Sequence, residues 1–233
     1  LAHIGGILYE NDLEKLGKFF NLMDEIMKER KELLRGGNYE QYVNAHGVVI
    51  PAIVIVIDQF SNFQEKTGGI YGDSLIQLSR NGAGYGIYLV ITSAGFGINE
   101  IPNRIGDNIR TVLCLEMSDK FQYSDVLHML HIEVYPESGI KGRGLINHNG
   151  NILEFQTALS VQAKDDYLRT QKIVEECEIM NSRWKGRKAR SIPNIPESPI
   201  LSQFLELESV QKNINDPYHL PLGYNQENAS VYS

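Results

Sequence analysis

Hydrophobic residues recur three or four positions apart between residues 11 and 35, which predicts an amphipathic helix. Asn11 is the expected N-cap, and Glu14 three residues later completes a capping box. Gly36 and Gly37 follow as a stop signal. The stretch 28–35 carries both charge signs and is expected to form a solvated helix face. The apolar stripe consists of Leu13, Leu16, Phe19, Phe20, Met23, Ile26, Met27, Leu33 and Leu34.

Three later apolar runs predict buried strands, over residues 48–57, 86–92 and 109–116. Continuous runs of this kind are typical of parallel strands that are covered on both faces. Pro51 should mark the entry to the first strand, because proline cannot donate a hydrogen bond in the middle of a ladder.

Helical patterns separate the predicted strands, at residues 73–82 and 121–131. Residues 139–159 then indicate a β-hairpin with its turn at residues 147–151. Helices that alternate with buried strands indicate an α/β layered fold with a mainly parallel sheet.

The character of the chain changes near Ala163. Residues 164–183 predict an amphipathic helix, and residues 190–199 contain three prolines and predict a stiff, extended linker. A short helix is expected at 200–209, followed by a segment that looks like the start of another unit. The predicted parts are residues 1–162, 163–199 and 200–233.

Composition narrows the function classes. The 233 residues carry a net charge of −7, which argues against a broad electrostatic grip on nucleic acid. The two cysteines, Cys114 and Cys177, lie far apart and suggest no disulfide framework, so we expect a reducing compartment and a buried Cys114. No apolar stretch reaches the roughly 18 residues of a membrane span. The opening at Leu1, without Met or a basic region, predicts a fragment or a processed product.

Asp58 and Thr92 fall at the carboxyl ends of the first two predicted strands, where ligands of parallel sheets bind. A carboxylate at the end of a buried strand is costly without a partner or a function. In nucleotide-hydrolysing enzymes this position supports the Mg²⁺ shell, the Walker B role. The alternative is a carboxylate that caps the following helix or turn, and spacing alone favours neither interpretation.

Other candidate sites are weaker. The phosphate-binding pattern Gly-x-x-x-x-Gly-Lys-[Ser/Thr] does not occur, so this chain alone is not expected to bind a nucleoside triphosphate well. The glycines between 82 and 86 precede a strand and indicate a tight turn. His128 and His131 have the spacing of two metal ligands, but structural roles are favoured. A basic patch around Trp184 suits phosphate or an acidic partner, although a solvated helix end is commoner; it consists of Lys185, Arg187, Lys188 and Arg190.

The order of these segments resembles the FtsK/SpoIIIE family of P-loop ATPases, beginning just after the P-loop half. Residues 1–4 resemble the family's Leu-Pro-His-Val/Ile segment, and residues 53–58 resemble its Walker B strand. Residues 78–94 resemble its Ala-Arg-x-Gly-Arg-x-x-Gly-Ile-His-Leu-Ile-x-Ala-Thr-Gln stretch. The resemblance implies a RecA-like layered fold that lacks the Walker A half and is followed by C-terminal linker helices.

The later segments resemble one branch of this family, the EssC/EccC motors of type VII secretion. Residues 142–145 and 154–159 resemble the closing hairpin of the middle ATPase module, and residues 219–224 resemble the strand that opens each following module. The resemblance implies the second half of one module, a linker and the first strand of the next. It also implies a cytoplasmic domain of a membrane-anchored protein.

Three departures fall at the family's catalytic positions. Gln59 stands in place of the Glu after the Walker B Asp, and a neutral amide cannot accept a proton from water. Ala83 replaces the second arginine of the Arg-x-Gly-Arg stretch, although Arg80 keeps the first. Loss of an arginine finger costs roughly 10³-fold or more in rate. Ala94 replaces a polar Gln, so we expect weak or absent hydrolysis.

The resemblance implies site roles for five residues: Asp58, Gln59 and Arg80 at catalytic positions, and Asp58, Thr92 and Ser93 around a nucleotide, with Asp58 reaching Mg²⁺ through water. ATP and Mg²⁺ are expected in the complete protein rather than in this fragment. Expected partners are neighbouring ATPase modules, in an oligomer, and small helical secreted substrates, with no nucleic acid.

The favoured interpretation is a degenerate module that regulates the motor in response to nucleotide or docks substrate. Two alternatives stay open. One is an interaction module that has lost nucleotide binding. The other is a DNA translocase of the same superfamily, against which the acidic balance and the closing hairpin count.

Overall fold

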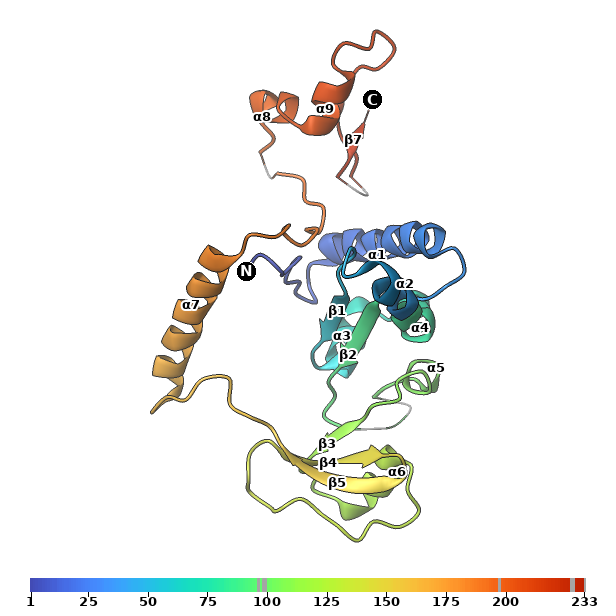
Figure 1. Cartoon of the computed structure of the whole chain (residues 1–233), viewed down its shortest axis with the longest axis vertical. Coiled ribbons are helices and arrows are strands. Elements are labelled where there is room, and N and C mark those ends of the chain that lie inside the picture. Colours follow the sequence, from blue (N-terminus) through green and yellow to red (C-terminus); the bar gives the residue numbers. More distant parts are fainter. Residues whose placement is uncertain (96, 98–99, 197, 227–228, 233) are drawn as a thin grey trace.

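The computed structural model describes residues 1–95, 97, 100–196, 198–226 and 229–232, arranged as three groups of elements along one long axis (Figure 1). The first group is an α/β unit, the second is a small antiparallel sheet with one helix, and the third, with α8 and α9, stands apart beyond α1 (Figure 1). Helix α7 lies to one side of these groups (Figure 1). The α/β unit contains α1 (Leu13–Leu34), α2 (Tyr39–His46), β1 (Ile53–Ile57), α3 (Phe60–Thr67), α4 (Gly72–Asn81), the 3-10 turn η1 (Gly82–Tyr85), β2 (Ile87–Ile91) and α5 (Asn103–Gly106).

Helix α1 confirms the predicted amphipathic helix, with one correction at its start. The N-cap is Asp12, whose carboxylate accepts a hydrogen bond from the Lys15 amide at 3.3 Å, so the capping box expected from Asn11 and Glu14 is wrong by one position. The helix ends where Arg35 and Gly36 both adopt positive φ, at 47° and 89°. Glycine tolerates that conformation without steric cost, which explains the stop.

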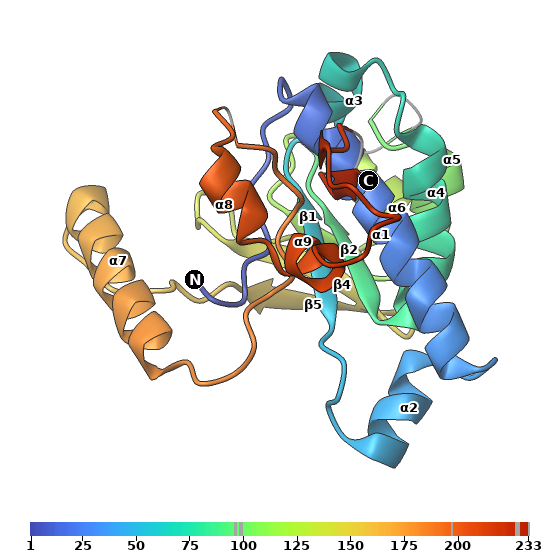
Figure 2. The ribbon, with the colours of Figure 1, turned by 90° about the horizontal axis from the view of Figure 1, so that it is seen from above.

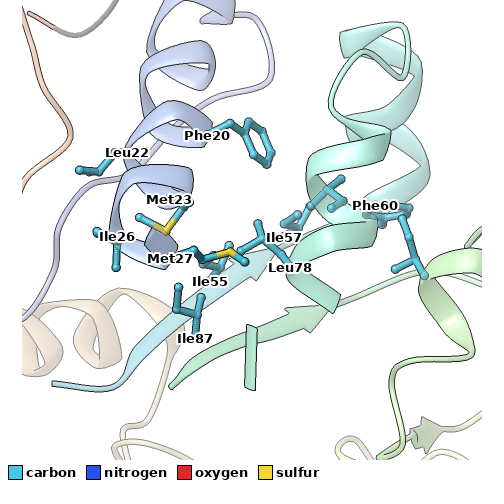
Figure 3. Close-up of a cluster of buried hydrophobic side chains, with 12 residues drawn as sticks. Phe20, Leu22, Met23, Ile26, Met27, Ile55, Ile57, Phe60, Leu78 and Ile87 are labelled. Atoms are coloured by element: carbon cyan, nitrogen blue, oxygen red, sulfur yellow. The ribbon is translucent and has the colours of Figure 1, made fainter. Parts of the chain in front are cut away.

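Strands β1 and β2 pair in parallel, with Ile53 opposite Ile87 and Ile57 opposite Ile91. Their inward side chains pack on α1 and α4, which lie to one side of the two strands (Figure 2). Figure 3 shows this core, in which two methionines and one isoleucine of α1 lie over the strands; its labelled members are Phe20, Leu22, Met23, Ile26, Met27, Ile55, Ile57, Phe60, Leu78 and Ile87.

The other face of β1 and β2 is uncovered. Val56 exposes 63% of its surface, and Val54, Tyr88 and Val90 are also exposed. The expectation that these strands are covered on both faces is therefore wrong for this chain. The alternation of buried and exposed residues shows that one layer of helices covers the sheet, although the apolar sequence would suit two layers.

The solvated face expected for residues 28–35 is confirmed for its other charged residues, which are exposed, but Arg30 is buried at the amino ends of both strands. Its guanidinium donates to the backbone oxygens of Tyr85 (2.6 Å), Gly86 (3.2 Å) and Pro51 (2.7 Å). Burial lowers the pKa of Arg30. Pro51 lies just before β1, as predicted, and its carbonyl is one of the three that Arg30 ties to α1.

The second group contains β3 (Leu113–Leu115), α6 (Lys120–Leu127), β4 (Arg143–His148) and β5 (Asn151–Gln156). The predicted hairpin is confirmed, with Asn149 and Gly150 at positive φ in its turn. The expectation that the third strand extends the parallel sheet is wrong, because β3 runs antiparallel to β4 in a separate three-stranded sheet. An apolar run of this length carries no information on the direction of its partner strand.

Buried side chains of β3, α6 and β4 form the core of the second group, including Cys114, Tyr123 and Leu145. Burial raises the pKa of Cys114 to about 11, which confirms its predicted role as a small hydrophobic residue. His128 is the C-cap of α6, in the left-handed conformation. Among the described residues, no three His, Cys, Asp or Glu side chains lie close enough together to hold a metal.

The remaining chain contains α7 (Asp166–Arg183), α8 (Leu201–Leu205), α9 (Glu208–Asn213), β6 (Gly223–Tyr224) and β7 (Val231–Tyr232). The described part of the predicted linker is extended, and its Glu197 lies outside the described residues, as does Ser233. Phe204 and Val210 are buried in a small core, and Phe204 packs edge-to-face on Tyr224. Within the described ranges, every helix is too short or too polar to cross a lipid bilayer.

Candidate functional site at the carboxyl edge of the parallel strands

Asp58 and Thr92 follow β1 and β2 directly, and the parallel register brings them together as predicted. The Thr92 hydroxyl donates a short hydrogen bond to the Asp58 carboxylate. The Thr92 amide also donates to the Ile57 carbonyl at 3.0 Å, which continues the ladder past the end of β2. Both side chains are exposed at this edge, so their oxygen atoms face solvent.

Gln59 carries the chain from β1 into α3 through a sharp turn. Its φ is 52°, a left-handed conformation that costs a non-glycine residue roughly 1 kcal/mol or more. Its backbone amide donates to the Thr92 hydroxyl oxygen at 2.9 Å, and the Phe60 backbone amide donates to the Thr92 carbonyl at 2.9 Å. Gln59 is the N-cap of α3 without a side-chain cap, and the Asp58 carboxylate accepts its hydrogen bond from the Thr92 hydroxyl.

Glu100 joins this edge, although no sequence pattern pointed to it. Its carboxylate accepts hydrogen bonds from the hydroxyls of Ser61 (2.6 Å) and Ser93 (3.0 Å). These bonds, first from Ser61 and then from Ser93, lower the pKa of Glu100. Ser93, predicted to lie near a nucleotide, is thus at the edge beside Thr92, with its hydroxyl held by Glu100.

Arg80 and Ala83 lie at the opposite end of the sheet. Arg80 is in the last turn of α4 and exposed, and Ala83 is in η1, just before β2 begins. At about 3.3 Å per residue, the five residues of β2 separate this end from Asp58 by roughly 15 Å. The structure therefore brings together four of the five predicted site residues and leaves Arg80 apart from them.

The carboxyl edge is rich in oxygen atoms. Asp58 and Glu100 supply carboxylates, the Thr92 hydroxyl bonds to the first, and the hydroxyls of Ser61 and Ser93 bond to the second. No Lys or Arg of the described chain forms an ion pair with either carboxylate. Such an edge suits a hard, hydrated cation, because Mg²⁺ prefers oxygen ligands and keeps several of its waters.

Nearly the whole chain matches a part of several secretion proteins. No family model matches the chain. It is 24% identical over 237 residues to the type VII secretion system protein EssC of Staphylococcus aureus (strain MRSA252), covering 100% of this chain and 16% of that protein. It is 24% identical over 234 residues to the ESX secretion system protein YukB of Bacillus subtilis (strain 168), covering 99% of this chain and 15% of YukB. The chain thus spans about a sixth of the length of these relatives.

Solved structures show the same relationship. The structure of EssC (ATPases 2 and 3) from Geobacillus thermodenitrificans matches 100% of this chain and 43% of its own, with a TM-score of 0.80 and 21% identity. EccC (ATPases 2 and 3) of Thermomonospora curvata, solved with a signal sequence peptide, matches 100% of this chain and 41% of its own, with a TM-score of 0.70 and 19% identity. The chain therefore has the fold of these ATPase domains, and the resemblance seen in its sequence is confirmed.

Proposed function

We propose, from the homology with the type VII secretion ATPases EssC and EccC, that this chain is the C-terminal part of one ATPase module joined to the start of the next. The observation that carries this proposal is the match of the whole chain to a structure that contains two consecutive ATPases. Residues 1–162 are then the module, residues 163–199 the linker, and residues 200–233 the beginning of the following module.

The uncovered face of β1 and β2 supports an incomplete module. A parallel sheet is normally covered on both faces, whereas here Val54, Val56, Tyr88 and Val90 form an exposed apolar surface. The phosphate-binding pattern is absent from all 233 residues. Both features agree with a module whose Walker A half is contributed by sequence outside this chain.

In the complete module, Asp58 would reach the magnesium ion of a bound nucleotide through water, and Thr92 and Ser93 would lie near the nucleotide. A carboxylate tied to a hydroxyl at the carboxyl edge of a parallel sheet fits a cation that keeps water ligands. A magnesium ion held there would supply charge neutralisation on the phosphates. Glu100 holds Ser93 and Ser61 in place through its two hydrogen bonds.

Hydrolysis by this module is proposed to be weak or absent. Gln59 supplies an amide where the family has a carboxylate, and an amide cannot take a proton from the attacking water. Ala94 removes a further polar group, whereas Ala83 lies in η1 at the other end of β2. Arg80 lies at the other end of β2, so within this chain it does not approach Asp58.

The proposed role is regulation of the motor in response to nucleotide, or docking of substrate. One EccC structure was solved with a signal sequence peptide, which supports contact with secreted substrates in this class of motor. Neighbouring modules are proposed partners, in an oligomer on the cytoplasmic side of a membrane-anchored protein; one similar structure is the cytoplasmic domain of EssC.

The second candidate is an interaction module that does not bind nucleotide. The exposed apolar face of the sheet favours it, because such a surface also suits a protein partner. A DNA translocase is less well supported, since the net charge of −7 works against binding phosphates along a duplex.

Equilibrium binding of an ATP analogue separates the first two candidates. The protein to use is the longer one that includes the Walker A half. We expect Asp58→Ala to weaken binding about ten-fold or more, because it removes a charged group from the magnesium shell. Asp73→Ala, an exposed carboxylate in the first turn of α4, is the matched control and should leave affinity unchanged. Equal affinity in all three proteins would favour the interaction module.

A further inference from the structure

Two segments far apart in the sequence run side by side next to α1 (Figure 1). The amide of Ala189 donates to the carbonyl of Ala2 at 2.7 Å, and the amide of Ile192 donates to the carbonyl of Gly5 at 3.3 Å. These bonds place residues 189–192 of the linker against residues 2–6. The linker is therefore attached to the first group at a defined place, although its prolines alone predict only a stiff spacer.

Two glycines allow the segments to approach closely. A Cβ atom on Gly5 would lie 2.8 Å from the carbonyl oxygen of Arg190, and one on Gly6 would lie 2.6 Å from Cδ1 of Ile192. Neither glycine has a positive φ, so their small size is what the contact requires. Any larger residue would force the linker backbone or the Ile192 side chain to move.

The Arg190 side chain adds a charged contact to α1. One guanidinium nitrogen lies 3.1 Å and 3.2 Å from the two carboxylate oxygens of Glu29, and the other lies 3.3 Å from Glu25. Glu25 and Glu29 are four residues apart and share one face of the helix. Arg190, one residue of the basic patch around Trp184, thus has an acidic partner within this chain.

Helix α1 connects this contact to the parallel strands. Glu29 faces the linker, while the next residue, Arg30, holds the backbone carbonyls before β1 and β2. Beyond residue 192 the linker leads to the group that contains α8, α9, β6 and β7, which stands apart from α1 (Figure 1). The contact at residues 189–192 therefore lies between the first group and this one along the chain.

We propose that residues 2–6, Glu25 and Glu29 form a docking surface for the chain's own residues 189–192, and that this docking sets the orientation of residues 201–232. The interactions in this contact are individually weak, so the contact can open. It consists of two backbone hydrogen bonds and ion pairs whose side chains are about half exposed, and salt screens such pairs. Release frees the following group, and docking fixes it on the first.

Amide hydrogen exchange of the 233-residue chain tests the docking itself. We expect Arg190→Ala to speed exchange of the Ala189 and Ile192 amides roughly two- to five-fold, the size of a half-exposed ion pair. Gly5→Ala should speed it more than about ten-fold, because the added methyl collides with the linker backbone. The matched controls are Lys188→Ala, an exposed basic residue nearby, and Gly72→Ala, where a Cβ meets nothing within 4 Å.

The double variant Arg190→Glu/Glu29→Arg swaps the two charges. It should recover part of the protection from hydrogen exchange that each single variant loses. Thermal unfolding of each variant is measured alongside, so that slower or faster exchange is compared only among folded proteins. Exchange that is unchanged in both Arg190→Ala and Gly5→Ala, or equally fast in the two controls, would overturn the docking proposal.

A distance measurement tests the effect on orientation. Spin labels at Glu32 of α1 and Glu206, the C-cap of α8, are introduced after Cys177 has been replaced by serine. We expect a narrow distance distribution at low salt, which broadens in Arg190→Ala and in the unchanged chain at high salt. A distribution that stays narrow while residues 189–192 lose protection would show that another contact orients the following group.

Discussion

The two ends of the β1–β2 pair are held in opposite ways. At the amino end, the buried guanidinium of Arg30 donates three hydrogen bonds to backbone carbonyls of two separate segments. At the carboxyl end, Asp58 and Thr92 are exposed, and their contacts are short-range bonds between hydroxyls, amides and a carboxylate. Buried charged hydrogen bonds contribute far more to stability than exposed ones. The amino end therefore contributes more to the stability of the fold. The exposed polar groups at the carboxyl end are available to bind a ligand.

The largest effect is expected at the amino end. Arg30→Ala should lower the free energy of unfolding by roughly 3 kcal/mol, because it removes three hydrogen bonds that a buried, charged donor makes to backbone carbonyls. Chemical denaturation followed by circular dichroism measures this. Arg35→Ala, at the exposed C-cap of the same helix, is the control and should change little. A loss below about 0.5 kcal/mol for Arg30→Ala would show that the amino end is not the more stable one.

A change of opposite sign is expected at the carboxyl end. Gln59→Gly should raise the free energy of unfolding by up to about 1 kcal/mol, because glycine adopts a φ of 52° without strain. The same denaturation experiment reads the change. The control is Gln64→Gly, inside α3 at ordinary helical geometry, which should instead destabilise the protein. Destabilisation by both changes would mean that the Gln59 side chain makes a contact that supports the turn.

A smaller, pH-dependent effect is expected at Glu100. Its pKa is lowered in the folded chain by the hydroxyls of Ser61 and Ser93, so its contribution is present above the unfolded pKa of about 4.5. As pH falls through the folded value, the carboxylate is protonated and that contribution is lost. Glu100→Gln should therefore flatten the dependence of unfolding free energy on pH between about pH 5 and 3. Identical slopes in the two proteins would argue against these hydrogen bonds.

The smallest effect is expected from restoring one catalytic group. Gln59→Glu in the longer protein should raise ATP hydrolysis by this module less than about ten-fold, because the polar group that the family has at the position of Ala94 is still missing and no arginine of this chain approaches the site. Steady-state phosphate release, with the other modules inactivated, measures the rate. A gain of roughly 10³-fold would show that the missing carboxylate alone accounts for the proposed inactivity.

Several elements of the fold follow from local pattern. The spacing of hydrophobic residues predicts α1 and the two parallel strands, and turn residues predict the hairpin of β4 and β5. Asp58 and Thr92 could be paired in advance because parallel strands end at the same edge of a sheet. These predictions need only residues within one segment and a general rule for sheets.

The features that sequence reasoning missed depend on distant partners. Arg30 is one of several charges in its stretch, and only the packing of α1 across the strand ends distinguishes it. Glu100 sits in a segment without periodicity, and its partners lie 39 and 7 residues away. The direction of β3 is set by the hairpin that follows it, which its own apolar residues do not encode.

The most direct test of the proposed site is the magnesium dependence of nucleotide binding in the longer protein. Affinity for an ATP analogue is measured with and without Mg²⁺, in the unchanged protein and in Asp58→Asn, which keeps the size of the side chain and removes its charge. We predict that Mg²⁺ strengthens binding to the unchanged protein and has about ten-fold less effect on the variant. An equal response to Mg²⁺ in both proteins would contradict a magnesium-nucleotide site at the carboxyl edge of β1 and β2.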